Sequence, residues 1–129
     1  MTGGRPRAVI ADDDAVIRRV LGLLMQREGF EVHAAADGDE AVELVREVFP
    51  QVVFLDARMP GTDGYDACRR IRSELDLASQ PVVVMVTGAG QAEDRERATA
   101  AGIDAFVTKP FSPSGLSARI RELRARGGW

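Results

Sequence analysis

Polar residues with reactive side chains end four separate apolar runs of the sequence. Asp12 and Asp13 follow the first run and Asp56 follows the third. Thr87 and Lys109 follow the fourth and the fifth. A carboxylate is a competent nucleophile toward phosphorus and gives an aspartyl phosphate. Because phosphoryl transfer needs cations and hydrogen-bond donors around the moving group, an ammonium and a hydroxyl at nearby strand ends suit this chemistry.

Three of these residues are carboxylates, Asp12, Asp13 and Asp56. On neighbouring strands they would repel one another by several kcal/mol. A hard divalent cation offsets such repulsion, and an all-oxygen site suits Mg²⁺, which readily bridges carboxylate and phosphate. The sequence therefore predicts a magnesium site beside a nucleophilic aspartate. Taken singly, each residue has a plainer role, since Asp13 or Asp14 could cap the first helix.

Apolar runs and amphipathic segments alternate five times along the chain. The predicted strands are 8–11, 30–35, 52–55, 81–86 and 105–108, and the predicted helices are about 16–28, 38–48, 64–75, 91–101 and 113–126. Asp37 with Glu40 forms a capping box, and Ser112 with Pro113 begins the last helix. This order predicts an α/β fold, a doubly wound five-stranded parallel sheet of order 2-1-3-4-5. Ligands of such sheets bind beyond the carboxyl ends of the strands, where the polar residues fall.

Length and composition favour one compact domain spanning residues 1–129. The 45% apolar and 29% charged residues are typical of a folded globular protein rather than a disordered one. No apolar run is long enough to cross a membrane. The single cysteine, Cys68, cannot form an internal disulfide, so we expect a cytoplasmic location. A net charge of −3 gives no general reason to bind nucleic acid.

Four segments resemble the receiver-domain family of bacterial response regulators. They are Val9–Asp14, Leu55–Gly64, Val86–Gly88 and Val107–Phe111, within a resemblance that runs from Arg7 to about Leu123. The resemblance implies the flavodoxin-like receiver fold already predicted. It also implies a signalling domain, not an enzyme acting on other substrates, which accepts a phosphoryl group from a histidine kinase or a histidine phosphotransfer protein. The chain is similar to the single-domain chemotaxis type, and a piece of a longer regulator is equally open.

The resemblance gives each residue of the site a role. Asp56 resembles the phosphoacceptor, and Lys109 resembles the lysine that contacts the phosphoryl group. Asp13 and Asp56 resemble direct ligands of Mg²⁺. The backbone carbonyl of Arg58 resembles a third ligand, and Asp12 is expected to act mainly through water.

The resemblance also implies a conformational switch. Thr87 resembles the residue whose hydroxyl moves toward the phosphoryl oxygen, and Phe106 the aromatic residue whose ring then packs inward. The altered face is formed by the fourth helix, the fifth strand and the fifth helix, and it serves a downstream effector protein or a fused output domain. It leaves a homodimer open, and Phe106 also fits an ordinary half-buried strand residue. Pro110 is commonly preceded by a cis peptide in this family, which helps to aim the lysine.

Two positions bear on the lifetime of the phosphorylated state. They are Arg58, two residues after the phosphoacceptor, and Ala89, two residues after Thr87. In the family these positions flank the path of the hydrolytic water. Ala89 has no group to orient water and Arg58 can block or hold it, so we expect slow intrinsic dephosphorylation.

Other functions fit the sequence less well. A flavodoxin-type flavin protein needs a phosphate-cradling loop after the first strand, where this chain has three aspartates. A haloacid-dehalogenase phosphohydrolase needs an aspartate at position 58, which is Arg58. A degenerate receiver that acts only as a docking module stays open. His33 is expected to be structural or merely exposed, because it lacks the surroundings of a phosphodonor histidine. Cys68 is expected to be a packed or surface thiol rather than a redox centre.

Overall fold

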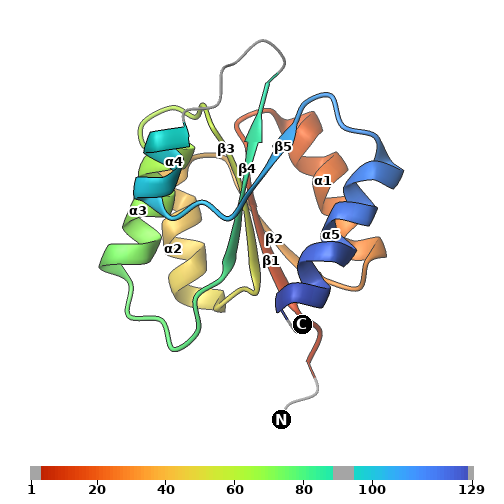
Figure 1. The fold of residues 1–129 in the computed structure, drawn as a ribbon, viewed down its shortest axis with the longest axis horizontal. Coiled ribbons are helices and arrows are strands. Elements are labelled where there is room, and N and C mark those ends of the chain that lie inside the picture. Colours follow the sequence, from red (N-terminus) through yellow and green to blue (C-terminus); the bar gives the residue numbers. More distant parts are fainter. Residues whose placement is uncertain (1–3, 89–94, 128–129) are drawn as a thin grey trace.

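The computed structural model describes residues 4–88 and 95–127, in which strands and helices alternate (Figure 1). The elements are β1 (Arg7–Ala11), α1 (Ala15–Arg27), β2 (Glu31–Ala35), α2 (Gly38–Val48), β3 (Val52–Asp56), α3 (Gly64–Glu74), β4 (Val82–Thr87), α4 (Arg95–Ala101), β5 (Ala105–Thr108) and α5 (Pro113–Gly127). Each predicted element is present, with bounds that differ by one or two residues except at α4. The first part of the predicted fourth helix, 91–94, lies outside the described residues. None of the described helices is long and apolar enough to cross a membrane.

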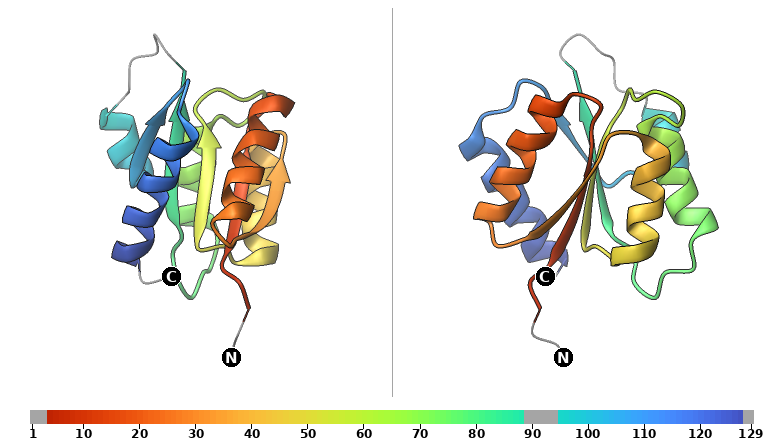
Figure 2. Two further views of the ribbon diagram at one scale, coloured as in Figure 1. Left: turned by 90° about the vertical axis from the view of Figure 1, so that its right-hand side faces the viewer. Right: turned by 180° about the vertical axis from the view of Figure 1, so that it is seen from behind.

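All described strands run parallel in one sheet of order β2-β1-β3-β4-β5, which confirms the predicted topology. Helices α1 and α5 cover one face, and α2, α3 and α4 cover the other (Figures 1 and 2). The central strand β3 is buried at all of its positions, as its continuous apolar run predicts. The outermost strand β2 is only half-buried along most of its length.

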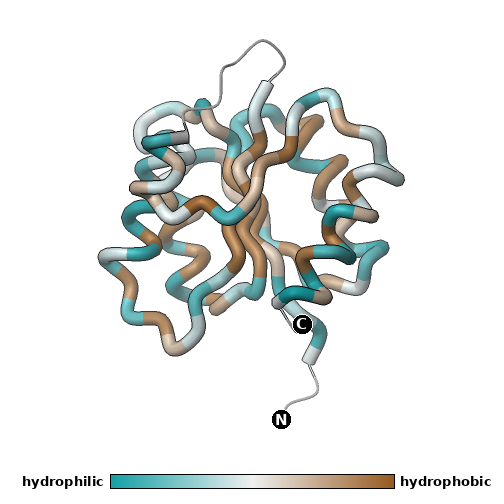
Figure 3. Tube along the Cα trace, viewed as in Figure 1, coloured by the Kyte–Doolittle hydropathy of each residue, from teal (hydrophilic) through white to brown (hydrophobic). Residues whose placement is uncertain are grey.

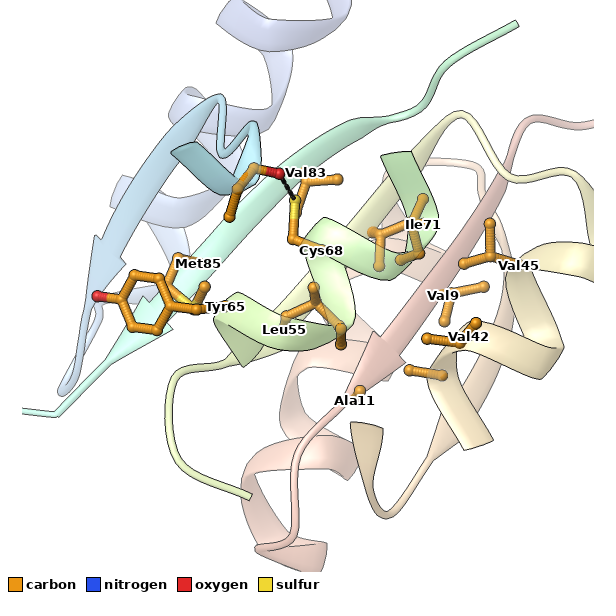
Figure 4. Packing of buried hydrophobic residues seen from close by; sticks show 14 of the residues in the cluster. Val9, Ala11, Val42, Val45, Leu55, Tyr65, Cys68, Ile71, Val83 and Met85 are labelled. Atoms are coloured by element: carbon orange, nitrogen blue, oxygen red, sulfur yellow. Dashed lines mark hydrogen bonds between the residues drawn. The ribbon is translucent and has the colours of Figure 1, made fainter. Parts of the chain in front are cut away.

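Two hydrophobic cores lie on the two faces of the sheet. Successive side chains of β1 point alternately into the two cores. Val9 and Ala11 pack under α2 and α3, whereas Ala8 and Ile10 pack under α1 and α5. The apolar colouring concentrates in the strands and on the inner sides of the helices (Figure 3). Figure 4 shows the first core, in which the Cys68 thiol donates to a backbone carbonyl of α4 at 3.2 Å. Cys68 is thus a buried, packed thiol, as expected for a structural residue.

Short polar side chains fix the starts of four helices. The carboxylates of Asp14, Asp37 and Asp63 accept hydrogen bonds from backbone N–H groups in the first turns of α1, α2 and α3. The Ser112 hydroxyl does the same for α5. Such caps contribute about 1 kcal/mol each. At the box predicted for α2, the Asp37 carboxylate accepts from the backbone N–H of Glu40 at 2.8 Å, which is one of its two expected bonds.

The start of α3 packs directly on the end of β3, and glycine makes this approach possible. A Cβ atom at Gly64 would lie 2.4 Å from the carbonyl oxygen of Asp56 and 2.8 Å from the sulfur of Met85. We therefore expect Gly64→Ala to lower the free energy of unfolding by about 2 kcal/mol or more, because the backbone at the site must shift. Chemical denaturation measures this change.

Gly22→Ala is the matched control within a helix. Its added Cβ would meet only a Val32 methyl, at an ordinary 3.6 Å. Alanine is also the better helix former, so this variant should be neutral or more stable by up to about 1 kcal/mol. Equal destabilisation by both substitutions would contradict the packing argument.

Candidate functional site

The carboxyl ends of β1, β3, β4 and β5 meet at one edge of the sheet, the upper edge in Figure 1. This edge carries the residues that the sequence singled out, because parallel strands all end on the same side. An open pocket lies there, lined by Asp13, Asp14, Asp56, Arg58, Gly88 and Lys109. The strand order thus brings residues that are far apart in the sequence, from Asp13 to Lys109, together in one site.

Asp12, Asp13 and Asp56 form an acidic cluster in which one carboxylate oxygen of each lies within 4.8 Å of the others. Asp12 is fully buried and Asp56 is 6% exposed, whereas Asp13 faces solvent. The Lys109 ammonium lies 3.1 Å from Asp12 Oδ2 and 3.5 Å from Asp56 Oδ2. One ammonium against three carboxylates leaves the cluster with an excess of negative charge.

Burial, and then the neighbouring charge of Asp12, raise the pKa of Asp56 to about 6. Lys109 and the backbone N–H of Arg58 act in the opposite direction but do not outweigh them. Burial also works against the charge of Lys109, yet its close contacts with the carboxylates of Asp12 and Asp56 raise the pKa of its ammonium. Lys109 therefore stays protonated and positively charged, in a site where the carboxylates repel one another.

The oxygen atoms of the cluster fit a hard cation. Asp12 Oδ2 is buried and accepts no hydrogen bond, so its 3.1 Å approach to Lys109 is a charge contact without hydrogen-bond geometry. The Asp13 side chain makes no hydrogen bond or ion pair within the described residues. Oxygen-only ligand sets with several carboxylates are the kind that bind Mg²⁺ or Ca²⁺. The acidic cluster can therefore hold a metal ion.

Thr87 ends β4 next to this cluster. It is buried, and its carbonyl oxygen accepts a hydrogen bond from the backbone N–H of Lys109 at 2.7 Å. The peptide bond between Lys109 and Pro110 is cis, as the family resemblance implies. The end of β4 thus fixes the backbone from which the lysine reaches into the site.

Phe106 does not line the pocket. It is half-buried, packs on the first core and lies opposite Met85 in the register of β4 and β5. Thr87 lies two residues after Met85 and so shares this face of the sheet with Phe106. Arg58 is exposed at the pocket rim, and its backbone N–H donates to Asp56 Oδ1 at 3.3 Å. Ala89 lies outside the described residues.

Sequence reasoning overlooked one residue of the site, Arg18 in α1. Its guanidinium Nη1 donates to the backbone carbonyl oxygen of Asp12 at 2.7 Å. The only signal in the sequence was a basic residue in the first turns of the helix that follows the acidic segment. His33 lies on β2, remote from this edge's pocket lining, and pairs with Glu31 at 2.7 Å, which agrees with a structural role.

Known proteins with this sequence pattern and fold are response regulators. The family model described as "Response regulator receiver domain" matches residues 8–121. The "Probable transcriptional regulator ycf27" of Porphyra purpurea is 38% identical over 98% of this chain and 50% of its own length. The "Transcriptional regulatory protein ResD" of Bacillus subtilis is 35% identical over 93% of this chain and 48% of its own length. This chain thus spans about half the length of these curated relatives.

The structural comparison agrees. The chemotaxis protein CheY4 of Vibrio cholerae has 26% sequence identity and a TM-score of 0.82, covering 91% of this chain and 97% of that one. An acidic cluster with a paired lysine at the ends of the strands is typical of the phosphoacceptor pocket of such proteins. Fold, pocket and family model lead to the same assignment: this chain belongs to the response regulator receiver domains.

Proposed function

We propose that residues 1–129 act as one receiver domain that takes a phosphoryl group onto Asp56, with Mg²⁺ bound in the acidic cluster. The observation that carries this proposal is the contact of Lys109 with both Asp12 and Asp56 beside an open pocket. A carboxylate oxygen of Asp56 attacks phosphorus while the bond from phosphorus to the donor histidine nitrogen breaks. Lys109 stabilises the negative charge on the transferred group, and the Thr87 hydroxyl is a further donor.

The metal ligands in this proposal are Asp13, Asp56 and the backbone carbonyl of Arg58, with Asp12 acting mainly through water. The cluster has an excess of negative charge, and its buried Asp12 Oδ2 accepts no hydrogen bond; both features support the choice of a hard cation. When bound, Mg²⁺ would neutralise oxygens of the phosphoryl group as it moves. Magnesium rather than calcium is proposed because phosphoryl transfer commonly uses a Mg²⁺ ion that keeps several of its waters.

Phosphorylation would act on the face formed by α4, β5 and α5 through Thr87 and Phe106. Both residues lie on the same face of the sheet, on adjacent strands β4 and β5. A Thr87 hydroxyl drawn toward the phosphoryl group would leave room into which the half-buried Phe106 ring can turn. Such a two-state change in packing is how local charge is converted into an altered surface.

A histidine kinase or histidine phosphotransfer protein is the proposed donor, and an effector protein or a fused output domain is the proposed target. The surface next to the pocket supports a protein donor. Helix α1 begins beside the acidic cluster and exposes Val16, Val20 and Leu23, of which Val16 is 69% exposed. An exposed apolar row of this kind is typical of a surface that a partner covers. The proposal includes a cytoplasmic location and leaves open whether the domain forms a homodimer.

The first prediction concerns the phosphorylated residue. Incubation with acetyl phosphate and Mg²⁺ should add one phosphoryl group to the protein, and chelation of the metal or Asp56→Asn should abolish the addition. Intact-protein mass spectrometry measures the adduct. Asp76→Asn, a change at an exposed aspartate far from the pocket lining, is the matched control and should be phosphorylated normally.

The absence of an adduct in every condition would contradict the proposal. The chain would then act as a docking module without phosphorylation, and the acidic cluster would need another role. An adduct that persists in Asp56→Asn would place the phosphoryl group on another residue.

The second prediction concerns pH and the metal-free protein. Because burial raises the pKa of Asp56 from 3.8 to about 6, ionisation costs the folded state free energy. The contribution of Asp56 to the stability of the wild-type protein should therefore fall as pH rises between these values, and the loss should be complete above them. Near neutral pH, Asp56→Asn should raise the free energy of unfolding by about 3 kcal/mol. Near pH 4 it should raise it far less.

Denaturation with a chelator present, at a series of pH values, measures this difference. Asp76→Asn should show no such dependence, because its carboxylate faces solvent. A stabilising effect of Asp56→Asn that stayed constant with pH would exclude the charge of Asp56 as its cause.

The third prediction concerns phosphoryl lifetime. Arg58 lies at the rim of the pocket, where its guanidinium can obstruct or hold water near Asp56. We expect the phosphorylated wild-type protein to decay slowly and Arg58→Ala to decay faster, as measured by loss of the adduct after removal of acetyl phosphate. Arg69→Ala, an exposed arginine of α3, should decay like the wild type. Decay of the wild type within seconds would refute the expectation.

A further inference from the structure

Arg18 reaches back from the second turn of α1 to the loop that carries the acidic residues. Its Nη1 donates to the carbonyl oxygen of Asp12 at 2.7 Å, a short, charge-assisted hydrogen bond. Asp12 is also held by its own N–H, which donates to Ala35, and by its Oδ1, which accepts from the N–H of Asp14 at 2.9 Å. Within the described residues, the bond from Arg18 is the contact that holds the carbonyl side of Asp12.

That carbonyl belongs to the peptide unit joining Asp12 to Asp13. The Asp13 side chain makes no hydrogen bond or ion pair within the described residues, and it faces solvent. Its place in the cluster therefore depends on the orientation of its backbone. The N-terminal half of that backbone is the peptide plane that Arg18 binds.

We propose that Arg18 is a positioning residue for the metal site: it fixes the peptide between Asp12 and Asp13, so that the Asp13 carboxylate points toward Asp56. The inference rests on the proposed binding of Mg²⁺ in the acidic cluster. Groups that orient metal ligands without touching the metal commonly change metal affinity by tenfold or more when removed.

The sign of the effect separates this role from a purely electrostatic one. A guanidinium near the cluster repels a divalent cation, so as a charge alone Arg18 would weaken metal binding. Its removal would then strengthen binding. As a positioning residue it strengthens binding, and its removal must weaken it.

The experiment is calorimetric titration of the metal-free 129-residue chain with MgCl₂, for wild type, Arg18→Met, Arg18→Lys and Arg19→Met. Methionine keeps the apolar stem but removes the charge and the donors. Arg19, the next residue of α1, is exposed and makes no hydrogen bond or ion pair within the described part of the chain, so Arg19→Met is the matched control for lost charge. Thermal denaturation in chelator tests each variant for intact folding.

We expect Arg18→Met to weaken Mg²⁺ binding about tenfold with little change in melting temperature, and Arg18→Lys to lie between it and the wild type. Arg19→Met should bind as tightly as the wild type or slightly more tightly. Unchanged or tighter binding by Arg18→Met overturns the inference, and so does Mg²⁺ binding by Arg18→Lys equal to the wild type if Arg18→Met fails to fold. A wild-type chain that binds no Mg²⁺ overturns the proposed metal site itself, which separates the two failures.

Discussion

The repulsion among carboxylates at one edge of the sheet is the constraint that the rest of the structure must satisfy. Two neighbouring strands, β1 and β3, end in carboxylates, and one oxygen each of Asp12, Asp13 and Asp56 lies within 4.8 Å of the others. At an effective dielectric constant of about 20, like charges at such a distance repel by roughly 3 kcal/mol per pair. The Lys109 ammonium offsets part of this repulsion. Burial first, and then the negative charge of Asp12, raise the pKa of Asp56, so an ionised Asp56 is costly in the folded protein. A folded chain that carries this cost is prepared to bind a cation and an electrophile.

The rest of the fold holds that edge in place despite the repulsion. Two packed cores, one on each face, keep the strands from separating. Hydrogen bonds at the other end of these strands hold the fold as well. Arg72 of α3 donates to the carbonyls of Gly102 and Pro81. It also forms an ion pair with Asp104 at 2.9 Å. This one side chain ties α3 to the starts of β4 and β5. Rigid strands are what allow a few ångströms of side-chain geometry to be maintained at their far ends.

The sequence was sufficient for the fold because each of its signals has a local cause. Continuous apolar runs predict buried parallel strands, and Asp37 and Ser112 were recognised as caps from their neighbours alone. The acidic cluster followed from strand order, since residues that end parallel strands must meet. The contact of Lys109 with Asp12 could not be predicted in the same way. Strands β1 and β5 are separated by β3 and β4, so the contact depends on the reach of a long side chain across the edge.

The contact of Arg18 with Asp12 is a second side-chain interaction that the sequence does not predict. Helical periodicity assigns it to the partly exposed side of α1, where an arginine usually needs no explanation. Only the coordinates show that its guanidinium turns back toward the Asp12 carbonyl. Long basic side chains have many rotamers, so which polar group they choose is decided by the three-dimensional surroundings and leaves little trace in the spacing of residues.

Lys109 links the charge at this edge to the strands that would carry a signal. Its ammonium contacts Asp12 and Asp56, while its backbone N–H donates to the carbonyl of Thr87. A phosphoryl group on Asp56 would add negative charge next to the ammonium and offer oxygens to both the ammonium and the Thr87 hydroxyl. Because Thr87 and Phe106 share one face of the sheet on adjacent strands, a shift of the first changes the space available to the second. The interaction that balances the resting site is thus also the one through which phosphorylation would reach the face of α4, β5 and α5.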